Sequence, residues 1–210
     1  MIKTDFKKEW KYLYRPSKTE FQVVEVPDMA FYKVDGLGTP GVVPEYTAAI
    51  EALYAMSYKT KFLSKKLEKD YVVPPLEGLW WADDMTTFTT ARDKSQWHWT
   101  MMIMTPDWIT EEMVDESRAE VSKKKDMPSL AKLRWEVYQE GLCVQILHLG
   151  SYDDEGPVLA KLHEKWMPEQ GYTFNGLHHE VYLSDPRKVE PEKLKTILRQ
   201  PICKRLGKSL

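Results

Sequence analysis

The sequence has few cysteines, no long apolar run and almost no net charge, and each of these shortages excludes a class of protein. Its two cysteines, Cys143 and Cys203, lie far apart and outside any CxxC spacing, so we expect both to be reduced packing residues. No run of about 18 apolar residues occurs, and the basic N-terminus lacks the apolar stretch of a signal peptide, which predicts a cytoplasmic protein without a membrane span. Lys and Arg number 30 and Asp and Glu 32, so neither nucleic acid nor an anionic membrane is an expected partner.

What the sequence does contain is ample material for a packed core. Hydrophobic residues make up 42% and aromatic residues 12% of the 210 residues. Alternation and helical spacing predict the same order of elements twice, namely strand, strand, helix, strand, strand. The strands are expected at 21–27, 29–36, 71–84, 96–104, 133–141, 142–150, 171–185 and 196–202, and the helices at 45–68, 106–125 and about 153–168.

The two halves also share a local sequence match. The stretch EGLWWAD, Glu77 to Asp83, lines up with the stretch that begins at Asn175, and their Gly-Leu pairs lie 176 − 78 = 98 residues apart. A repeat of that length indicates two similar units rather than a solenoid. We predict an α+β fold of two pseudo-symmetric repeats, each an antiparallel sheet with a helix, with a ligand cleft between them. The predicted segments are a basic arm at 1–20, a first repeat at 21–105, a connecting helix at 106–130, a second repeat at 131–203 and a tail at 204–210.

Glu180 is the most unusual residue of the second repeat. It lies in a strand-forming stretch, where a carboxylate costs desolvation free energy unless it faces a partner or a ligand. Alternation places Glu180 on one strand face with His178 and Tyr182. The other face, which carries Val181 and Leu183, is expected to lie under the helix of its repeat. Glu180 is therefore predicted to form the floor of a pocket in the cleft.

Aromatic residues are the candidates for the walls of that pocket. Each well-placed ring contact adds about 0.5–1.5 kcal/mol to the binding of a flat ligand beyond burial. Periodicity alone does not separate ligand binding from core packing, so both roles stay open for each residue. The predicted ligand-binding residues are Trp80, Trp81, Trp97, Trp99, Trp135, Tyr138, Tyr182 and His178, and Tyr54 and Tyr58 are available as further rings.

Several stretches of the chain together resemble the GyrI-like small-molecule-binding superfamily. They are EGLWWADD, QWHWTMMIMTPDWIT, EGLCVQILHLGSYDDEGP, GLHHEVYLSDPRKVEPEKLKTILRQPI and AIEALYAMSYKTKF, and the resemblance runs from about Phe21 to Ile202. The family is built from duplicated SHS2-like units and is related to the drug-binding domains of multidrug-responsive regulators and to the gyrase inhibitory protein. No helix-turn-helix segment accompanies the match, so a regulator is not expected.

Within that superfamily the chain looks most similar to a stand-alone branch that includes cyclopropanoid cyclopropyl hydrolases. Those enzymes add water to the strained ring of DNA-alkylating natural products. The resemblance implies that Glu180, in the HHEVYLSDP stretch, is the pocket carboxylate and that aromatic residues of both halves wall the cavity.

A single buried carboxylate among rings has two chemical uses. With a raised pKa it is a general base near neutral pH, and in its ionised form it is a counter-ion for a lipophilic cation. In the enzyme hypothesis Glu180 takes a proton from water while Tyr54 or Tyr58 donates to the carbonyl oxygen of a cyclopropane-bearing dienone. In the alternative hypothesis the protein binds hydrophobic or cationic drugs without changing them. A third possibility is a protein-interaction module, for which the sequence offers no clear exposed patch.

Metal and cofactor sites are not indicated by the sequence. His178 and Glu180 point away from His179 in a strand, and no HExxH or second His/Cys cluster supplies further ligands. The glycines between Gly36 and Gly41 match neither GxGxxG nor GxxxxGK, which argues against a nucleotide site. We expect neither a metal nor a cofactor.

Overall fold

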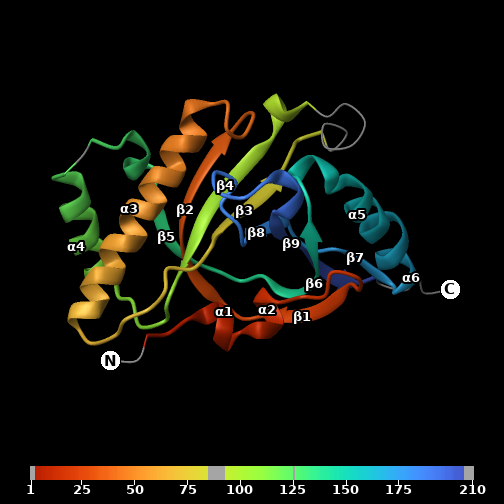
Figure 1. Ribbon diagram of the computed structural model, residues 1–210, viewed down its shortest axis with the longest axis horizontal. Coiled ribbons are helices and arrows are strands. Elements are labelled where there is room, and N and C mark those ends of the chain that lie inside the picture. The colour runs from red at the N-terminus through yellow and green to blue at the C-terminus, as the bar shows by residue number, and fades with distance from the viewer. Residues whose placement is uncertain (1–2, 85–92, 125, 206–210) are drawn as a thin grey trace.

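The computed structural model describes residues 3–84, 93–124 and 126–205, and within them nine strands form one antiparallel sheet (Figure 1). The strand order is β1-β6-β9-β8-β3-β4-β2-β5, and β7 pairs with the end of β9. The α+β fold class is therefore confirmed. The strands are β1 Gln22–Val26, β2 Met29–Leu37, β3 Leu76–Trp81, β4 His98–Thr105, β5 Arg134–Tyr138, β6 Gly141–Leu149, β7 Tyr172–Phe174, β8 His178–Tyr182 and β9 Lys195–Lys204.

Of the two long helices of the first half, α3 begins within one residue of its predicted start, whereas the helix predicted from 106 begins only at Glu111 and ends at Ser122. α3 starts at Pro44, where a missing backbone N–H does no harm, because the first N–H groups of a helix have no partner within it. α4 is capped by Thr110, whose hydroxyl accepts from the backbone of Met113 at 3.4 Å. The helices are α1 Phe6–Glu9, α2 Lys11–Tyr14, α3 Pro44–Lys66, α4 Glu111–Ser122, α5 Gly156–Ala160 and α6 Met167–Glu169, with a π-helical stretch Lys161–Trp166 between the last two.

The second half departs from the predicted elements in two places. The strand expected at 171–185 is two strands, β7 and β8, which pair with different parts of β9. The helix expected to be capped by Asp153 or Asp154 begins only at Gly156, because Asp154 is engaged in a turn, where it accepts from Ser151 Oγ at 2.7 Å. Glu155 occupies the cap position without a side-chain cap hydrogen bond. Pro168 also does not stop the helix, which continues to Glu169.

The two halves join edge to edge through β3 and β8, and they do not form two facing sheets. Gly78 pairs with Glu180 at this junction. Outward from this junction the strands follow in the same order on both sides, β3-β4-β2 on one and β8-β9-β6 on the other. Each outermost strand comes from the other half of the sequence, because β5 lies beside β2 and β1 lies beside β6. Joining the central edges removes two unpaired strand edges. Gly78 lies inside β3 whereas Gly176 precedes β8, so the matched Gly-Leu pairs are not equivalent positions.

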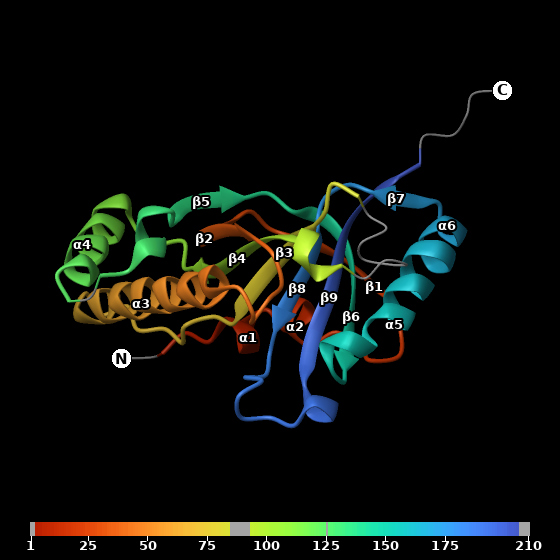
Figure 2. The same cartoon turned by 90° about the horizontal axis from the view of Figure 1, so that it is seen from above.

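The face of the sheet that carries Glu180 is the face covered by α3. Tyr32 of β2 lies 2.7 Å, hydroxyl to hydroxyl, from Thr60 of α3. The register of β2, β4, β3 and β8 places Tyr32 in one row with Ile103, Leu76 and Tyr182, and directly paired residues share a face. Figure 2 shows α3 beside the first half of the twisted sheet and α5 beside the second.

The opposite face of the sheet is covered by the N-terminal arm over β9 and β6. Arg199 of β9 donates to the backbone oxygen of Leu13 in α2 at 3.3 Å, and Val181 on this face is fully buried. The prediction that Val181 lies under the helix of its own repeat is therefore wrong. Residues 3–20 supply a layer that the repeat pattern does not contain, and the helices lie on the other face.

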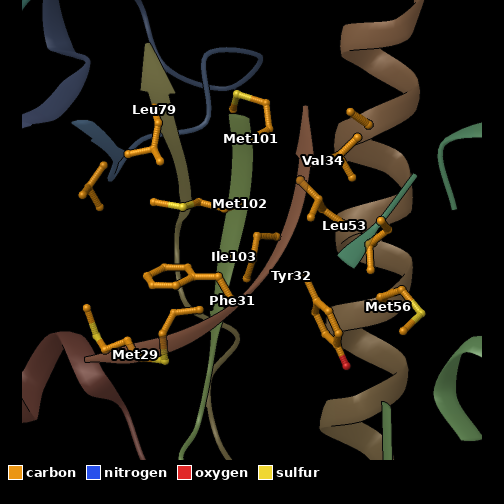
Figure 3. Packing of buried hydrophobic residues seen from close by; sticks show 14 of the residues in the cluster. Met29, Phe31, Tyr32, Val34, Leu53, Met56, Leu79, Met101, Met102 and Ile103 are labelled. Atoms are coloured by element: carbon orange, nitrogen blue, oxygen red, sulfur yellow. The ribbon is translucent and has the colours of Figure 1, made fainter. Parts of the chain in front are cut away.

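The main core lies between α3 and the strands of the first half (Figure 3). Leu53 and Met56 of α3 are fully buried there, as are Met101 and Ile103 of β4. Complete burial of one such side chain stabilises the fold by about 1.5–3 kcal/mol. In the part of the chain that the structure describes, no helix has the length and apolar character needed to cross a membrane.

Candidate functional site

Glu180 lies at the centre of the sheet with a hydrogen bond to a neighbouring tyrosine. Its side chain is 13% exposed, and its Oε2 accepts from the hydroxyl of Tyr182 at 2.7 Å. That hydroxyl in turn accepts from Nε1 of Trp80 at 3.0 Å. The second oxygen, Oε1, lies 3.4 Å from Nε2 of His178. The carboxylate is thus neither in bulk solvent nor paired with an arginine.

The register of β3 and β8 explains why these groups meet. Gly78 lies directly opposite Glu180, and Trp80 lies opposite His178. Because Gly78 has no side chain, the space above it is open to the indole of Trp80 and the hydroxyl of Tyr182. A Cβ at this position would lie 2.9 Å from Trp80 Nε1 and 3.0 Å from the Tyr182 oxygen.

Two further tyrosines border Glu180, one from each half. The ring of Tyr46 at the start of α3 lies 6.4 Å from Trp80 and packs edge-on against Trp99 at 5.2 Å. The ring of Tyr152 packs edge-on against Tyr182 at 5.7 Å, and 38% of Tyr152 remains exposed. Burial, followed by the negative charge of Glu180, raises the pKa of Tyr46 well above its usual value and that of Tyr152 to about 12. Both hydroxyls therefore keep their protons at neutral pH.

Glu155 brings a second carboxyl group to the same place. It is 4% exposed and lies just before α5. Burial, followed by the charge of Glu180, raises the pKa of Glu155 to about 10. A neutral carboxylic acid and a negatively charged carboxylate side by side can give one proton and take another. The sequence conceals this residue, because a glutamate in the polar stretch YDDEGP is typical of an exposed turn.

The α5 side of the site contains an unusual number of buried polar atoms without a hydrogen-bond partner among the described residues. They are Glu155 Oε1, Thr196 Oγ1, His163 Nε2 and both ring nitrogens of His178. Burial, together with the nearby His178, lowers the pKa of His163 to about 4, so this imidazole is neutral. Buried polar groups in folded proteins are nearly always hydrogen-bonded to protein or to ordered water, so these atoms are available to water or to a ligand.

Five of the residues predicted from the sequence gather on the Glu180 face. Trp80, Tyr182 and His178 lie around the Glu180 carboxyl group. Trp97 meets Trp80 edge-on at 6.1 Å, and Trp99 is fully buried beneath Tyr46, so it supports the ring wall from behind.

The other predicted wall residues lie elsewhere. Trp81 is on the opposite face, where it stacks on His98 at 5.3 Å. Trp135 and Tyr138 belong to β5, the outermost strand, four strands from β8 and therefore roughly 19 Å away at about 4.8 Å per strand. The prediction that they lie beside Glu180 is wrong, because alternation within a strand does not determine which strands are neighbours.

Tyr54 and Tyr58, the proton donors expected from the sequence, are not next to Glu180. They stack on one another at 6.2 Å, and Tyr58 is 49% exposed. The side of α3 that faces the sheet carries Ala49, Leu53 and Met56, and Tyr46 continues this row. Sequence reasoning selected the neighbouring row and so missed Tyr46, although helical spacing from the buried positions could have found it.

A network of charges lies on the reverse face of β8. His179 is fully buried between two carboxylates, with Nδ1 2.7 Å from Glu140 Oε1 and Nε2 2.9 Å from Glu77 Oε2. Arg199 Nη1 lies 3.2 Å from Glu140 Oε2, and Arg199 Nε donates to Gln145 at 3.1 Å. With His179 protonated, two positive and two negative charges balance.

In the described parts of the chain, no group of three or more His, Cys, Asp or Glu side chains is arranged to hold a metal ion.

Two surface hollows lie away from Glu180. One hollow, of about 240 Å³, is lined by Ser64, Leu67, Lys69, Trp108, Thr110 and Met113, and the other, of about 510 Å³, by Asp35, Gly36, Leu37, Glu45, Trp81, His98 and Lys132.

Comparison with known proteins places this chain in a family. Residues 19–202 match the model of the GyrI-like small molecule binding domain. Among solved structures, an uncharacterized conserved protein from Listeria innocua is 38% identical over 96% of this chain and 100% of its own, with a TM-score of 0.87. A protein described as a hydrolase from Listeria innocua, encoded by lin2189, has the same identity and coverage and a TM-score of 0.85. The EcmrR C-terminal domain, 13% identical over 89% of this chain and 98% of its own, shares the fold with a TM-score of 0.55. No curated protein matches the chain.

Proposed function

The chain belongs to the GyrI-like family of small-molecule binding domains, and on that premise we propose that it is a detoxifying hydrolase that adds water to flat aromatic compounds bearing a strained cyclopropane. The observation that carries the proposal is the pair of buried carboxyl groups, Glu180 and Glu155, beside a wall of rings. The similarity to the Listeria innocua protein described as a hydrolase supports the same reaction type.

The proposed reaction needs one proton acceptor and one proton donor. Glu180 accepts a proton from the attacking water, whose oxygen forms a bond to a cyclopropane methylene. The ring C–C bond breaks, its electron pair makes the conjugated dienone aromatic, and the former carbonyl oxygen becomes a phenolate that takes a proton from Glu155. One water is added and no atom leaves. A proton transfer from Glu180 back to Glu155 then restores the starting state.

The proton donor in this proposal differs from the tyrosines expected from the sequence. Tyr54 and Tyr58 stack on each other, whereas Glu155 and Tyr46 both lie within the electrostatic influence of Glu180. Glu155 is the better acid of the two, because a carboxylic acid with a pKa of about 10 loses its proton more readily than a tyrosine whose pKa is raised above that value. Trp80 and Trp97 are proposed to hold the flat part of the substrate.

The proposal is tested with spiro[2.5]octa-4,7-dien-6-one, the simplest dienone that carries a spiro-fused cyclopropane. Incubation with the protein is expected to yield 2-(4-hydroxyphenyl)ethanol, a gain of one water detectable by mass spectrometry. Replacement of the general base, Glu180→Gln, should lower turnover by about 100-fold or more while the compound still binds. Glu192→Gln, in an exposed turn, is the matched control and should retain full turnover. Equal turnover in the two variants would remove Glu180 from the mechanism.

Sequestration without chemistry is the second candidate function, favoured by the negative charge of Glu180 among aromatic rings. A lipophilic cation would gain both a counter-ion and ring faces there. In that case the dienone is recovered unchanged. Glu180→Gln then weakens the binding of the cationic dye rhodamine 6G, while a neutral aromatic compound such as pyrene binds as before. Equal weakening of both compounds would argue against recognition of charge.

A further inference from the structure

The hydrogen-bond chain from Trp80 through Tyr182 to Glu180 has only one possible direction. An indole N–H can only donate, so the Tyr182 oxygen must accept from it at 3.0 Å. A carboxylate can only accept, so the single Tyr182 proton must go to Glu180 Oε2 at 2.7 Å. Since this proton is already committed, Tyr182 cannot donate it to a ligand at the same time.

The chain crosses the junction between the two halves and depends on one glycine. Trp80 belongs to β3, whereas Tyr182 and Glu180 belong to β8. Gly78 lies between them on β3, where a Cβ would come within 3.0 Å of both Trp80 Nε1 and the Tyr182 hydroxyl, and 3.3 Å from the sulfur of Met101. Its backbone is not in the left-handed region that favours glycine. Glycine weakens a strand interior, so its place here is explained by space rather than by conformation.

Building on the proposed function, we propose that Trp80 and Tyr182 are positioning residues that anchor Oε2 of Glu180, and that Gly78 provides the space for this anchor. The anchored oxygen cannot rotate toward the substrate without losing its hydrogen bond. Oε1, which lies 3.4 Å from His178 Nε2 and has no hydrogen bond to it, is then the oxygen that accepts the proton from water. Fixing one oxygen keeps the other in a reactive geometry at every turnover.

The first test of the anchor is kinetic and uses Tyr182→Phe. This variant keeps the ring and removes the hydroxyl. With the spiro-dienone as substrate, kcat should fall about 10-fold to 100-fold with KM within about threefold, because a misdirected base loses reactivity more than binding. The acid limb of the pH–rate profile should move to higher pH, since the lost hydrogen bond favoured the charged carboxylate. Tyr12→Phe, at an exposed tyrosine, is the matched control and should match the wild type. An unchanged kcat and an unchanged acid limb in Tyr182→Phe would overturn the proposal.

The second test does not depend on turnover. In protein labelled with [δ-¹³C]glutamate, the Glu180 carboxyl resonance is assigned by its loss in Glu180→Gln. At constant pH its chemical shift should change in Tyr182→Phe, which removes the hydrogen bond to Oε2, and in Gly78→Ala, which adds only a methyl group beside it, but not in Tyr12→Phe. If Gly78→Ala does not fold, Trp80→Phe replaces it and should cause a smaller shift in the same direction, because it removes only the outer hydrogen bond.

The two readouts separate the anchor from the reaction. A wild type that leaves the dienone unchanged would refute the hydrolase proposal, and the shifts of the carboxyl resonance would still support the anchor. A carboxyl resonance that keeps the wild-type chemical shift in these variants would refute the anchor even if the wild type is an active hydrolase.

Discussion

The two faces of β8 carry neighbouring polar residues of similar chemistry, but their side chains are hydrogen-bonded on one face and largely lack hydrogen bonds on the other. On the reverse face, His179 is bonded through both nitrogens, and Arg199 balances the second carboxylate. On the front face, both nitrogens of the adjacent His178 lack a hydrogen-bond partner, as does Oε1 of Glu155. Among the described residues of the reverse network, one side-chain oxygen, Glu77 Oε1, also lacks a hydrogen-bond partner. A satisfied network holds strands together, whereas an unsatisfied one is available to a ligand.

The two networks also differ in the effect that they have on folding. Burial lowers the pKa of His179, but Glu140 and Glu77 outweigh it and raise the value to about 9, so the native state favours the charged form. Burial and the charge of Glu180 raise the pKa of Glu155 to about 10, so folding forces this group to hold a proton. At neutral pH the ionised groups of the reverse face therefore increase the free energy of unfolding. The protonated Glu155 on the front face lowers it, and this group is the one proposed to react.

The largest expected effect comes from breaking the reverse network. Arg199→Met removes one charge and leaves Glu140 with His179 alone. The free energy of unfolding should fall by about 3–5 kcal/mol, as is usual when one partner of a buried ion pair is removed. Denaturant unfolding monitored by tryptophan fluorescence measures this change. Glu180→Gln on the front face serves as the comparison and should change stability by less than about 1 kcal/mol. A loss of similar size in both variants would remove the distinction between the faces.

The next effect is the pH dependence of stability that His179 produces. Its native pKa of about 9 lies above its unfolded value of 6.5, so its contribution is complete below pH 6.5 and is lost as the pH rises through about 9. The difference corresponds to about 3 kcal/mol. His179→Gln should therefore be less stable than the wild type at pH 6, and the gap should narrow by pH 9.5. Unfolding curves at several pH values test this, and a constant gap would contradict it.

The smallest effect has the opposite sign and belongs to the front face. The pKa of Glu155 is raised from 4.5 to about 10, so its contribution to stability is complete below pH 4.5 and is lost progressively as the pH rises toward 10. Glu155→Gln removes this penalty, and at pH 7 it should stabilise the protein by about 2 kcal/mol while turnover of the spiro-dienone falls. Melting temperatures at pH 7 and pH 4.5 provide the measurement, with the gain expected only at pH 7. Destabilisation at pH 7 would show that Glu155 is a structural residue.

The sequence alone was sufficient for the features that depend on local geometry. Alternation placed Glu180, Tyr182 and His178 on one strand face, and helical spacing located α3 within two residues of its ends. These properties are fixed by bond geometry within a few residues, so neighbouring elements do not alter them.

Only the tertiary structure decided which of these faces meet. It placed Trp135 and Tyr138 four strands from β8, brought Tyr46 rather than Tyr54 toward the site, and buried Glu155 beside Glu180. Periodicity tells which way a side chain points within its own element, but strand order and helix docking determine what it points at. The pKa of a carboxyl group depends on the burial and charge around it, so the raised pKa of Glu155 beside Glu180 could not be predicted from the sequence.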